Sequence, residues 1–296
     1  MHSQKTDMID KKNNKTYLNE DYWLRLHANF KGKLQSVGWP GLSEEFNKIK
    51  YESELNSFLS ILSQLDIQKE DTLKILEVGV GTGFWIAAVQ EFCSQHELIP
   101  ELTAADISLD ALDFVVSRYP NLIAEHLDLA CVPVDKFAQK FDIVLSVMVL
   151  LHLTNPESFN NGLRFSATSV RDGGLLVLYE PAIVNSYSPW SDRPISSENN
   201  SLGRHLTEFD KILSKQGFER LAIFPGASWL TNSPIEAHTY IGFKIRKFFW
   251  KILTKTIYSS DLLSSFSRRI ILKLDALIKQ SGNGCSGKFL IYKKCY

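Results

Sequence analysis

Residues 73–84 read Leu-Lys-Ile-Leu-Glu-Val-Gly-Val-Gly-Thr-Gly-Phe, and this stretch decides the fold. It begins as a short apolar strand, passes through three alternating glycines and leads into an apolar helix. Glycines tolerate positive φ and let the backbone approach a ligand, while the free N–H groups at a helix start favour a polar or anionic group. The stretch therefore predicts a strand, loop and helix that together bind a ligand.

Two common nucleotide-binding loops do not fit this stretch. A dinucleotide fingerprint needs G-x-G-x-x-G, but counting from Gly79 the third glycine comes one place early and Phe84 stands in its position. A P-loop needs Gly-Lys-Ser/Thr, which does not follow. An NAD-dependent oxidoreductase is therefore disfavoured, and the pattern that remains is E-x-G-x-G-x-G.

The rest of the chain alternates short apolar runs with helical patterns. This alternation is typical of parallel strands that are buried on both faces by crossover helices. We expect strands over residues 73–78, 102–106, 122–126, 141–147, 175–180, 219–224 and 287–292. We expect helices over residues 17–30, 44–65, 84–92, 109–118, 156–170 and 207–216, with two more between 241 and 279.

Composition limits the classes of partner. Lys plus Arg and Asp plus Glu both number 33 among the 296 residues, so no global charge draws the chain to nucleic acid. The four cysteines form no C-x-x-C pair and have no neighbouring His, so we expect reduced thiols and no metal site. The polar N-terminus lacks the apolar core of a signal peptide, which predicts a cytoplasmic protein.

The patterns divide the chain into five parts. We expect a disordered tail at 1–16, a helical N-terminal cap at 17–70 and a ligand-binding core at 71–236. A helical lid or substrate insertion follows at 237–286, and residues 287–296 form the last strand of the core. Insertions of this kind usually carry substrate choice, because loops vary on a fixed scaffold.

The glycine stretch resembles the first motif of class I S-adenosylmethionine-dependent methyltransferases, and four further motifs follow in the order of that family. They occupy residues 104–108, 125–129, 140–153 and 171–181. The resemblance implies an α/β fold, namely a doubly wound, mostly parallel, seven-stranded Rossmann-like sheet whose last strand is antiparallel. It also implies S-adenosylmethionine as cofactor, with S-adenosylhomocysteine as product, across the carboxyl ends of the strands.

The resemblance assigns Glu77 to the methionine amino group and Asp106 to the two ribose hydroxyls. A carboxylate suits the ribose because it accepts two hydrogen bonds at once. The other candidate cofactor-binding residues are Gly79, Gly81, Gly83, Ile107, Asp128, Ser146 and Tyr51. Structural alternatives stay open: a glycine turn without a ligand, helix capping by Asp106, and core packing for Ile107 and Tyr51.

Three residues are candidates for catalysis. His152 follows the fourth strand, where an acceptor would approach the methyl group, and an imidazole titrates near neutral pH, so it could act as general base. Glu180 ends the fifth strand facing the same crevice, and His205 is the third candidate. The alternative for His152 is a structural histidine that is hydrogen-bonded within its loop.

The sequence says less about the methyl acceptor than about the cofactor. An Asn-Pro-Pro-Tyr-type motif is missing after the fourth strand, where residues 146–149 read Ser-Val-Met-Val, and this argues against adenine or glutamine nitrogen. The N-terminal cap, with Gly38, Trp39 and Asn47, resembles small-molecule O-methyltransferases of bacterial glycan and secondary-metabolite pathways. A nitrogen, carbon or lipid-linked acceptor, and a non-catalytic binding or assembly protein of this fold, remain alternatives.

The stretch from 241 to 280 is basic, with nine Lys or Arg against two Asp. Lys244, Lys247, Lys251 and Lys255 form a stripe beside the apolar Ile241, Ile245, Phe248 and Ile252. One interpretation is a helix that contacts a membrane surface or a lipid-linked substrate. The favoured interpretation is a lid whose apolar side packs on the sheet and whose lysines are solvated.

Overall fold

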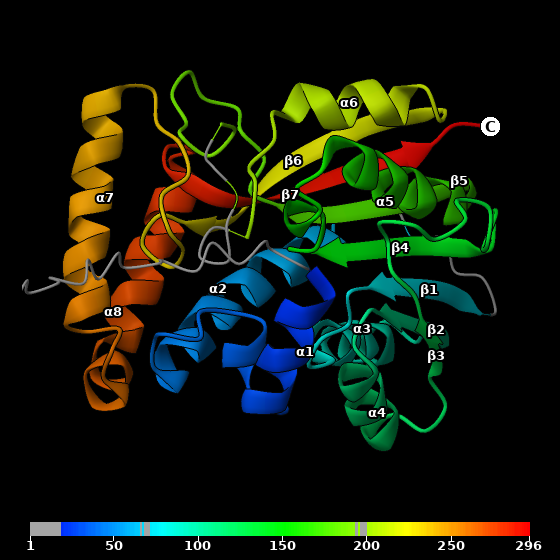
Figure 1. The fold of residues 1–296 in the computed structure, drawn as a ribbon, viewed down its shortest axis with the longest axis horizontal. Helices are drawn as coiled ribbons and strands as arrows, with labels where there is room; N and C mark the ends of the chain where they lie inside the picture. Colours follow the sequence, from blue (N-terminus) through cyan, green and yellow to red (C-terminus); the bar gives the residue numbers. More distant parts are fainter. Residues whose placement is uncertain (1–18, 66, 68–71, 193–194, 196–199) are drawn as a thin grey trace, which may run out of the picture.

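The computed structural model describes residues 19–65, 67, 72–192, 195 and 200–296, so the expected tail at 1–16 lies outside the described residues. Within them a seven-stranded sheet carries helices on both faces (Figure 1). The strand order is β3-β2-β1-β4-β5-β7-β6, with β7 antiparallel to β5 and β6 and the other neighbours parallel. The expected doubly wound, mostly parallel sheet is thereby confirmed.

The strands and helices begin and end close to the expected positions. The strands are β1 Leu73–Val78, β2 Pro100–Asp106, β3 Ile123–His126, β4 Phe141–Val147, β5 Val170–Glu180, β6 Phe218–Ser228 and β7 Cys285–Lys294. The helices are α1 Asn19–Asn29, α2 Glu44–Leu62, α3 Phe84–Gln95, α4 Leu109–Arg118, α5 Pro156–Ser169, α6 Leu206–Ser214, α7 Tyr240–Lys255 and α8 Asp261–Gln280. Two 3₁₀ turns, η1 Leu34–Ser36 and η2 Leu150–His152, complete the description.

Strand β5 starts five residues earlier than its apolar run. Residues 171–174, Arg-Asp-Gly-Gly, have the composition of a turn, yet β5 already pairs with β4 at Val170. A bulge between Phe141 and Ile143 shifts the register, and Gly173 takes a φ of 73°. Because glycine adopts this conformation freely, the strand continues through a sequence that otherwise signals its end.

The core lies on both faces of the sheet because alternate residues of each strand point to opposite faces. On β1, for example, Ile75 packs in the cluster under α2 and α3, whereas Leu76 packs in the cluster under α5 and α6. A third cluster joins α2 to α7 and α8 through Phe46, Trp250 and Ile271. In the described part of the chain, no helix is both long and apolar enough to cross a membrane. The division at residues 70 and 236 stays a prediction.

Candidate active site

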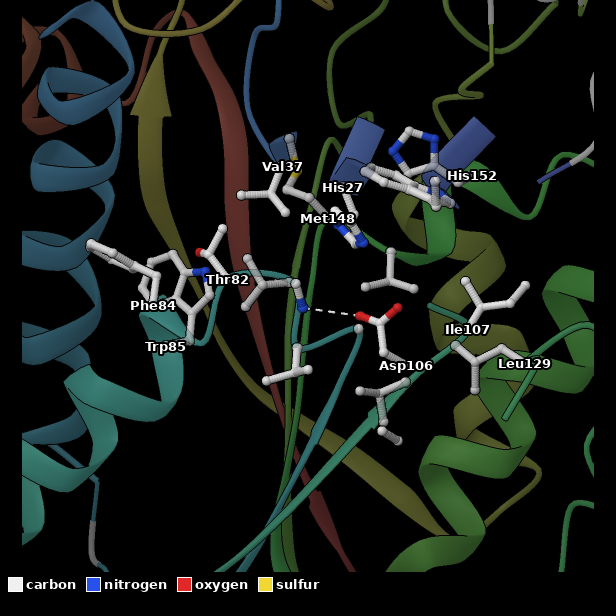
Figure 2. Close-up of a pocket in the computed structure, with 18 of the residues that line it drawn as sticks. His27, Val37, Thr82, Phe84, Trp85, Asp106, Ile107, Leu129, Met148 and His152 are labelled. Atoms are coloured by element: carbon white, nitrogen blue, oxygen red, sulfur yellow. Dashed lines mark hydrogen bonds between the residues drawn. The ribbon is translucent and has the colours of Figure 1, made fainter. Parts of the chain in front are cut away.

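The carboxyl ends of β1, β2 and β4 open into a pocket (Figure 2). Its wall combines apolar side chains with a few polar groups, as is usual in small-molecule and cofactor sites. The glycine turn after β1 forms one wall, and α1 lies over the pocket through Trp23 and His27. The pocket therefore lies at the edge of the sheet where doubly wound folds bind their ligands.

The glycine turn needs glycine for its backbone and for its neighbours. Gly79, Gly81 and Gly83 have φ angles of 75°, 51° and 72°, which side-chain-bearing residues rarely adopt. A Cβ atom on Gly79 would collide with the side chain of Val149, and one on Gly81 would lie 2.5 Å from Cγ1 of Val37. The turn is thus held open toward the pocket by the absence of side chains.

Asp106, at the end of β2, is joined to this turn. Its Oδ2 accepts a hydrogen bond from Gly81 N at 2.9 Å (Figure 2). Its Oδ1 accepts one from Ser108 N at 2.9 Å. Burial raises the pKa of Asp106, while these hydrogen bonds and the nearby His27 act in the opposite direction. A carboxylate has about four acceptor positions, so Asp106 can still accept hydrogen bonds from a ligand.

Glu77 is a buried carboxyl group just before the turn. Neither of its oxygens has a hydrogen-bond partner of normal geometry in the described part of the chain. Burial raises its pKa well above the ordinary value, the Asp106 carboxylate raises it further, and the nearby amide of Ile86 offsets only a part. A buried polar group without a partner is uncommon and points to a missing ligand atom, here a cation.

His27 on α1 is a pocket residue that our sequence interpretation missed. It is 6% exposed, and neither ring nitrogen has a hydrogen-bond partner among the described residues. Burial lowers its pKa, with Asp106 and Asp110 partly opposing this effect, so the neutral ring is favoured. The signal that could have found it is the four-residue spacing from Trp23, which places both rings on one side of the helix.

His152 lies in the pocket wall, on the turn that follows β4. Its Nδ1 is 3.0 Å from the carbonyl oxygen of Asn200, and its ring meets that of Trp23 edge-on at a centroid distance of 4.8 Å. A carbonyl oxygen can only accept, so Nδ1 carries the hydrogen and the neutral ring has its lone pair on Nε2. This orientation suits a general base.

Glu180 holds that turn in place and does not itself reach the pocket. Its Oε1 accepts hydrogen bonds from Val149 N and Leu150 N at 3.1 and 2.8 Å, and its Oε2 accepts one from Leu151 N at 3.1 Å. Burial raises the pKa of Glu180 to about 8, although the three amides and Arg204 favour the ionised form. The expected catalytic position is therefore corrected: Glu180 is a positioning residue for His152.

We expect the stability of the chain to fall as pH rises from about 4.5 to about 8 because of Glu180. In this window the folded chain keeps the proton and the unfolded chain loses it, so the unfolded state binds fewer protons and rising pH favours it. The free energy of unfolding would fall by up to about 1.4 kcal/mol per pH unit. Urea unfolding of the wild type and of Glu180→Gln across this range measures it.

The Glu180→Gln variant should be less stable than the wild type at low pH, because its NH₂ group faces the Leu151 amide. Its free energy of unfolding should not fall with pH in this range. Glu157→Gln, at an exposed position on α5, serves as the matched control and should keep the wild-type slope. Equal slopes in the wild type and in Glu180→Gln would show that Glu180 is ionised throughout this range.

The structure brings only part of the predicted set to the pocket. Gly79, Gly81, Asp106, Ile107, Asp128, Tyr51 and His152 line it, whereas Glu77, Gly83, Ser146, Glu180 and His205 do not. Ser146 is buried within β4, and Gly83 is the N-cap of α3. His205 is exposed at the start of α6, where its N–H donates to Glu208, so it is corrected to a helix-capping position.

The insertion at 237–286 also contributes no residue to this pocket among the described residues. Its helix α7 does not pack its apolar stripe on the sheet: Ile241, Ile245, Phe248 and Ile252 are all exposed. The favoured interpretation of this stretch, a lid with its apolar side buried, is therefore wrong. The buried side of α7 is formed by Phe243 and Trp250 instead.

The sheet order and a glycine turn that faces an acidic strand end define a class of nucleoside-binding α/β enzymes. Residues 75–174, about a third of the chain, match the family model described as a methyltransferase domain. A search of curated proteins gave no match.

Three solved structures share the fold. Phosphoethanolamine N-methyltransferase 2 of Haemonchus contortus matches with a TM-score of 0.53 and 14% identity, over 95% of this chain and 61% of that one. A complex of a methyltransferase with the Trm112 activator from Haloferax volcanii matches with a TM-score of 0.51 and 12% identity, over 95% of this chain and 100% of that one. A protein from Galdieria sulphuraria, proposed to be a sarcosine dimethylglycine methyltransferase, matches with a TM-score of 0.50 and 13% identity, over 94% of this chain and 98% of that one.

The fold and the domain match agree with the five motifs. Residues 75–174 are a methyltransferase domain, and the sheet has the fold of class I S-adenosylmethionine-dependent methyltransferases. The identities of 12–14% to the solved structures show the fold and leave the acceptor open.

Proposed function

We propose that this enzyme transfers the methyl group of S-adenosylmethionine to a hydroxyl oxygen of a small molecule, with His152 as general base. The bound cofactor supplies an activated methyl group on a positively charged sulfur. The chain's own residues bind and orient both reactants and remove the acceptor proton. The observation that carries the proposal is the hydrogen bond that fixes Nδ1 of His152 on the carbonyl oxygen of Asn200.

The residues of the pocket fit the cofactor. Asp106 offers acceptor positions to a ribose diol, and the open glycine turn lets a ligand lie against the backbone. Glu77 does not line the pocket, but its buried carboxyl lies just before the glycine turn and has no hydrogen-bond partner of normal geometry among the described residues, so an ammonium group of the methionine part would supply one. Ile107 and Leu129 provide an apolar end for the adenine ring, with Asp128 beside them.

An oxygen acceptor is favoured by what surrounds His152. A neutral amine already has a nucleophilic lone pair and attacks without a base, whereas an alcohol gains about a hundred- to ten-thousand-fold from a positioned base. Here a base is held in one tautomer, on a turn that Glu180 fixes through three amides. Such positioning is the main contribution that a protein makes to an in-line displacement.

The proposal is tested by methyl transfer from radiolabelled S-adenosylmethionine to a panel of hydroxylated small molecules, each paired with its amine analogue. We expect methyl ethers, identified by mass spectrometry. Transfer to the amine analogues alone, or no transfer by a chain that binds the cofactor, would contradict the proposal.

His152→Ala should lower turnover of the accepted hydroxyl compound by about a hundredfold, because a general base is worth at least this much. The dissociation constant of S-adenosylhomocysteine, measured calorimetrically, should change by less than about twofold.

His96→Ala is the matched control. His96 also places Nδ1 on a backbone carbonyl, that of Phe92, at 2.9 Å, but it lies at the end of α3, away from the pocket. It should leave turnover unchanged. Equal losses of turnover and cofactor affinity in His152→Ala would mean that the histidine acts through the structure of its turn.

A further inference from the structure

Helices α7 and α8 lie at one end of the molecule (Figure 1). Both leave large apolar side chains exposed. The exposed residues are Ile241, Ile245, Phe248, Phe249 and Ile252 on α7 and Leu262, Leu263, Phe266, Ile270, Leu274 and Leu277 on α8. Phe266 is 87% exposed and Phe248 is 61% exposed. Their spacing of three and four residues places most of each set along one side of its helix. We call these eleven residues the apolar face of α7 and α8.

A solvated surface helix buries its apolar side and leaves polar residues outside. Helices α7 and α8 bury some apolar residues, among them Trp250 and Ile271, but each also exposes a second apolar side. Helix α8 buries Asp275, whose oxygens accept from Ser53, Thr231 and the amide of Ser228 at 2.5, 2.6 and 3.0 Å. Helix α7 has a partly buried Arg246, which donates to Asn283 at 2.6 Å. Polar bonds and apolar packing both attach the inner sides, while further phenylalanines and isoleucines face outward.

Unneutralised cations accompany the apolar face. Helix α7 contains five Lys or Arg and no acidic residue. Lys251 and Lys255 on α7 and Arg269 and Lys273 on α8 are exposed and have no carboxylate partner in the described part of the chain. The chain as a whole is neutral, so the excess of cations in 241–280 is balanced by acidic residues elsewhere. The charge is therefore concentrated at this end.

The combination of cations and apolar side chains favours one kind of binding partner for this face. A second copy of the chain joined by a two-fold axis would bring the same patch against itself, so lysines would face lysines. An anionic bilayer offers acyl chains to the isoleucines and phenylalanines and phosphates to the lysines. We propose that the apolar face of α7 and α8 docks on the surface of a membrane that contains anionic lipids.

The test is co-sedimentation of the full chain with vesicles of equal parts phosphatidylglycerol and phosphatidylcholine, compared with vesicles of phosphatidylcholine alone. We expect binding to the anionic vesicles that weakens with salt. The double variant Lys251→Glu/Lys255→Glu should weaken it by about tenfold or more, since each lysine near such a surface contributes a several-fold gain. Phe248→Ser/Phe266→Ser should weaken it to a similar degree.

Matched controls lie elsewhere on the surface. Lys211→Glu/Lys215→Glu has the same spacing at the end of α6, and Ile99→Ser removes an exposed apolar residue that precedes β2. Both should bind as the wild type does, and circular dichroism should show all variants folded. The proposal is overturned if the wild type ignores anionic vesicles, or if the controls weaken binding as much as the α7 and α8 variants.

Sedimentation velocity without lipid tests whether a second copy of the chain, rather than a membrane, covers this face. We expect a wild-type monomer at the protein concentration of the vesicle assay. A wild-type dimer that Phe248→Ser/Phe266→Ser converts to monomer would overturn the membrane proposal and assign this face to a second copy. Neither measurement depends on the methyl acceptor, so failure here leaves the proposed reaction untouched.

Discussion

Asp106→Ala is expected to weaken the binding of S-adenosylhomocysteine by about a hundredfold or more. The substitution would remove the two charge-assisted hydrogen bonds that we propose Asp106 to accept from the ribose, each worth about 1.5–3 kcal/mol. It also removes the acceptor that fixes Gly81 N at 2.9 Å, so the glycine turn loses its tie to β2. Isothermal titration calorimetry with the purified chain measures the loss.

Asp110→Ala is the matched control, because Asp110 is exposed in the first turn of α4 and also lies near His27. It should bind the ligand almost as the wild type does. Asp106→Asn, which keeps one acceptor oxygen, should fall between the two. If Asp106→Ala remained folded and retained wild-type affinity, the ribose assignment would be wrong.

Gly81→Val should abolish detectable binding of the same ligand. Gly81 has a φ of 51°, and a Cβ there would lie 2.5 Å from Cγ1 of Val37, so the new side chain must push into the pocket or distort the turn. A strained backbone of this kind costs about 1–3 kcal/mol before any clash is counted. Calorimetric titration and a thermal melt of the same sample measure affinity and folding together.

Gly217→Val is the control that introduces backbone strain without a steric clash. Gly217 has a φ of 78°, and a Cβ there meets nothing within 4 Å. This control should lose some stability and keep its affinity. The double variant Gly81→Ala/Val37→Ala should bind better than Gly81→Ala alone, because it removes the clash and leaves the strain. Wild-type affinity in Gly81→Val would exclude the turn as a binding element.

The sheet could be predicted because its signals are local. Buried parallel strands are continuous apolar runs, and β1 and β4 begin and end at the expected residues. The glycine turn and Asp106 were also accessible, since they occupy strand ends whose meeting point the fold dictates. The bulge in β5 was not, because it depends on pairing with β4 rather than on the composition of residues 171–174.

The wall of the pocket could be predicted less well because it depends on long-range packing. His27 is brought to the pocket by the placement of α1, and its four-residue spacing from Trp23 indicates a shared side of the helix but not what that side faces. Glu180 ends a strand at the predicted place, but its partners are amides about thirty residues away, so its positioning role is visible only in three dimensions. On α7 the periodicity was correct, but periodicity alone does not say which side faces the protein.

The position of α1 over the pocket has a kinetic consequence. A ligand held between the glycine turn and α1 leaves more easily when that helix separates from the turn after β4, which it meets through Trp23 and His152. The residence time of the product would then be governed by aromatic packing at the entrance, independently of the groups that recognise the nucleoside. The histidine that we propose as general base would then also contribute to the rate of product release.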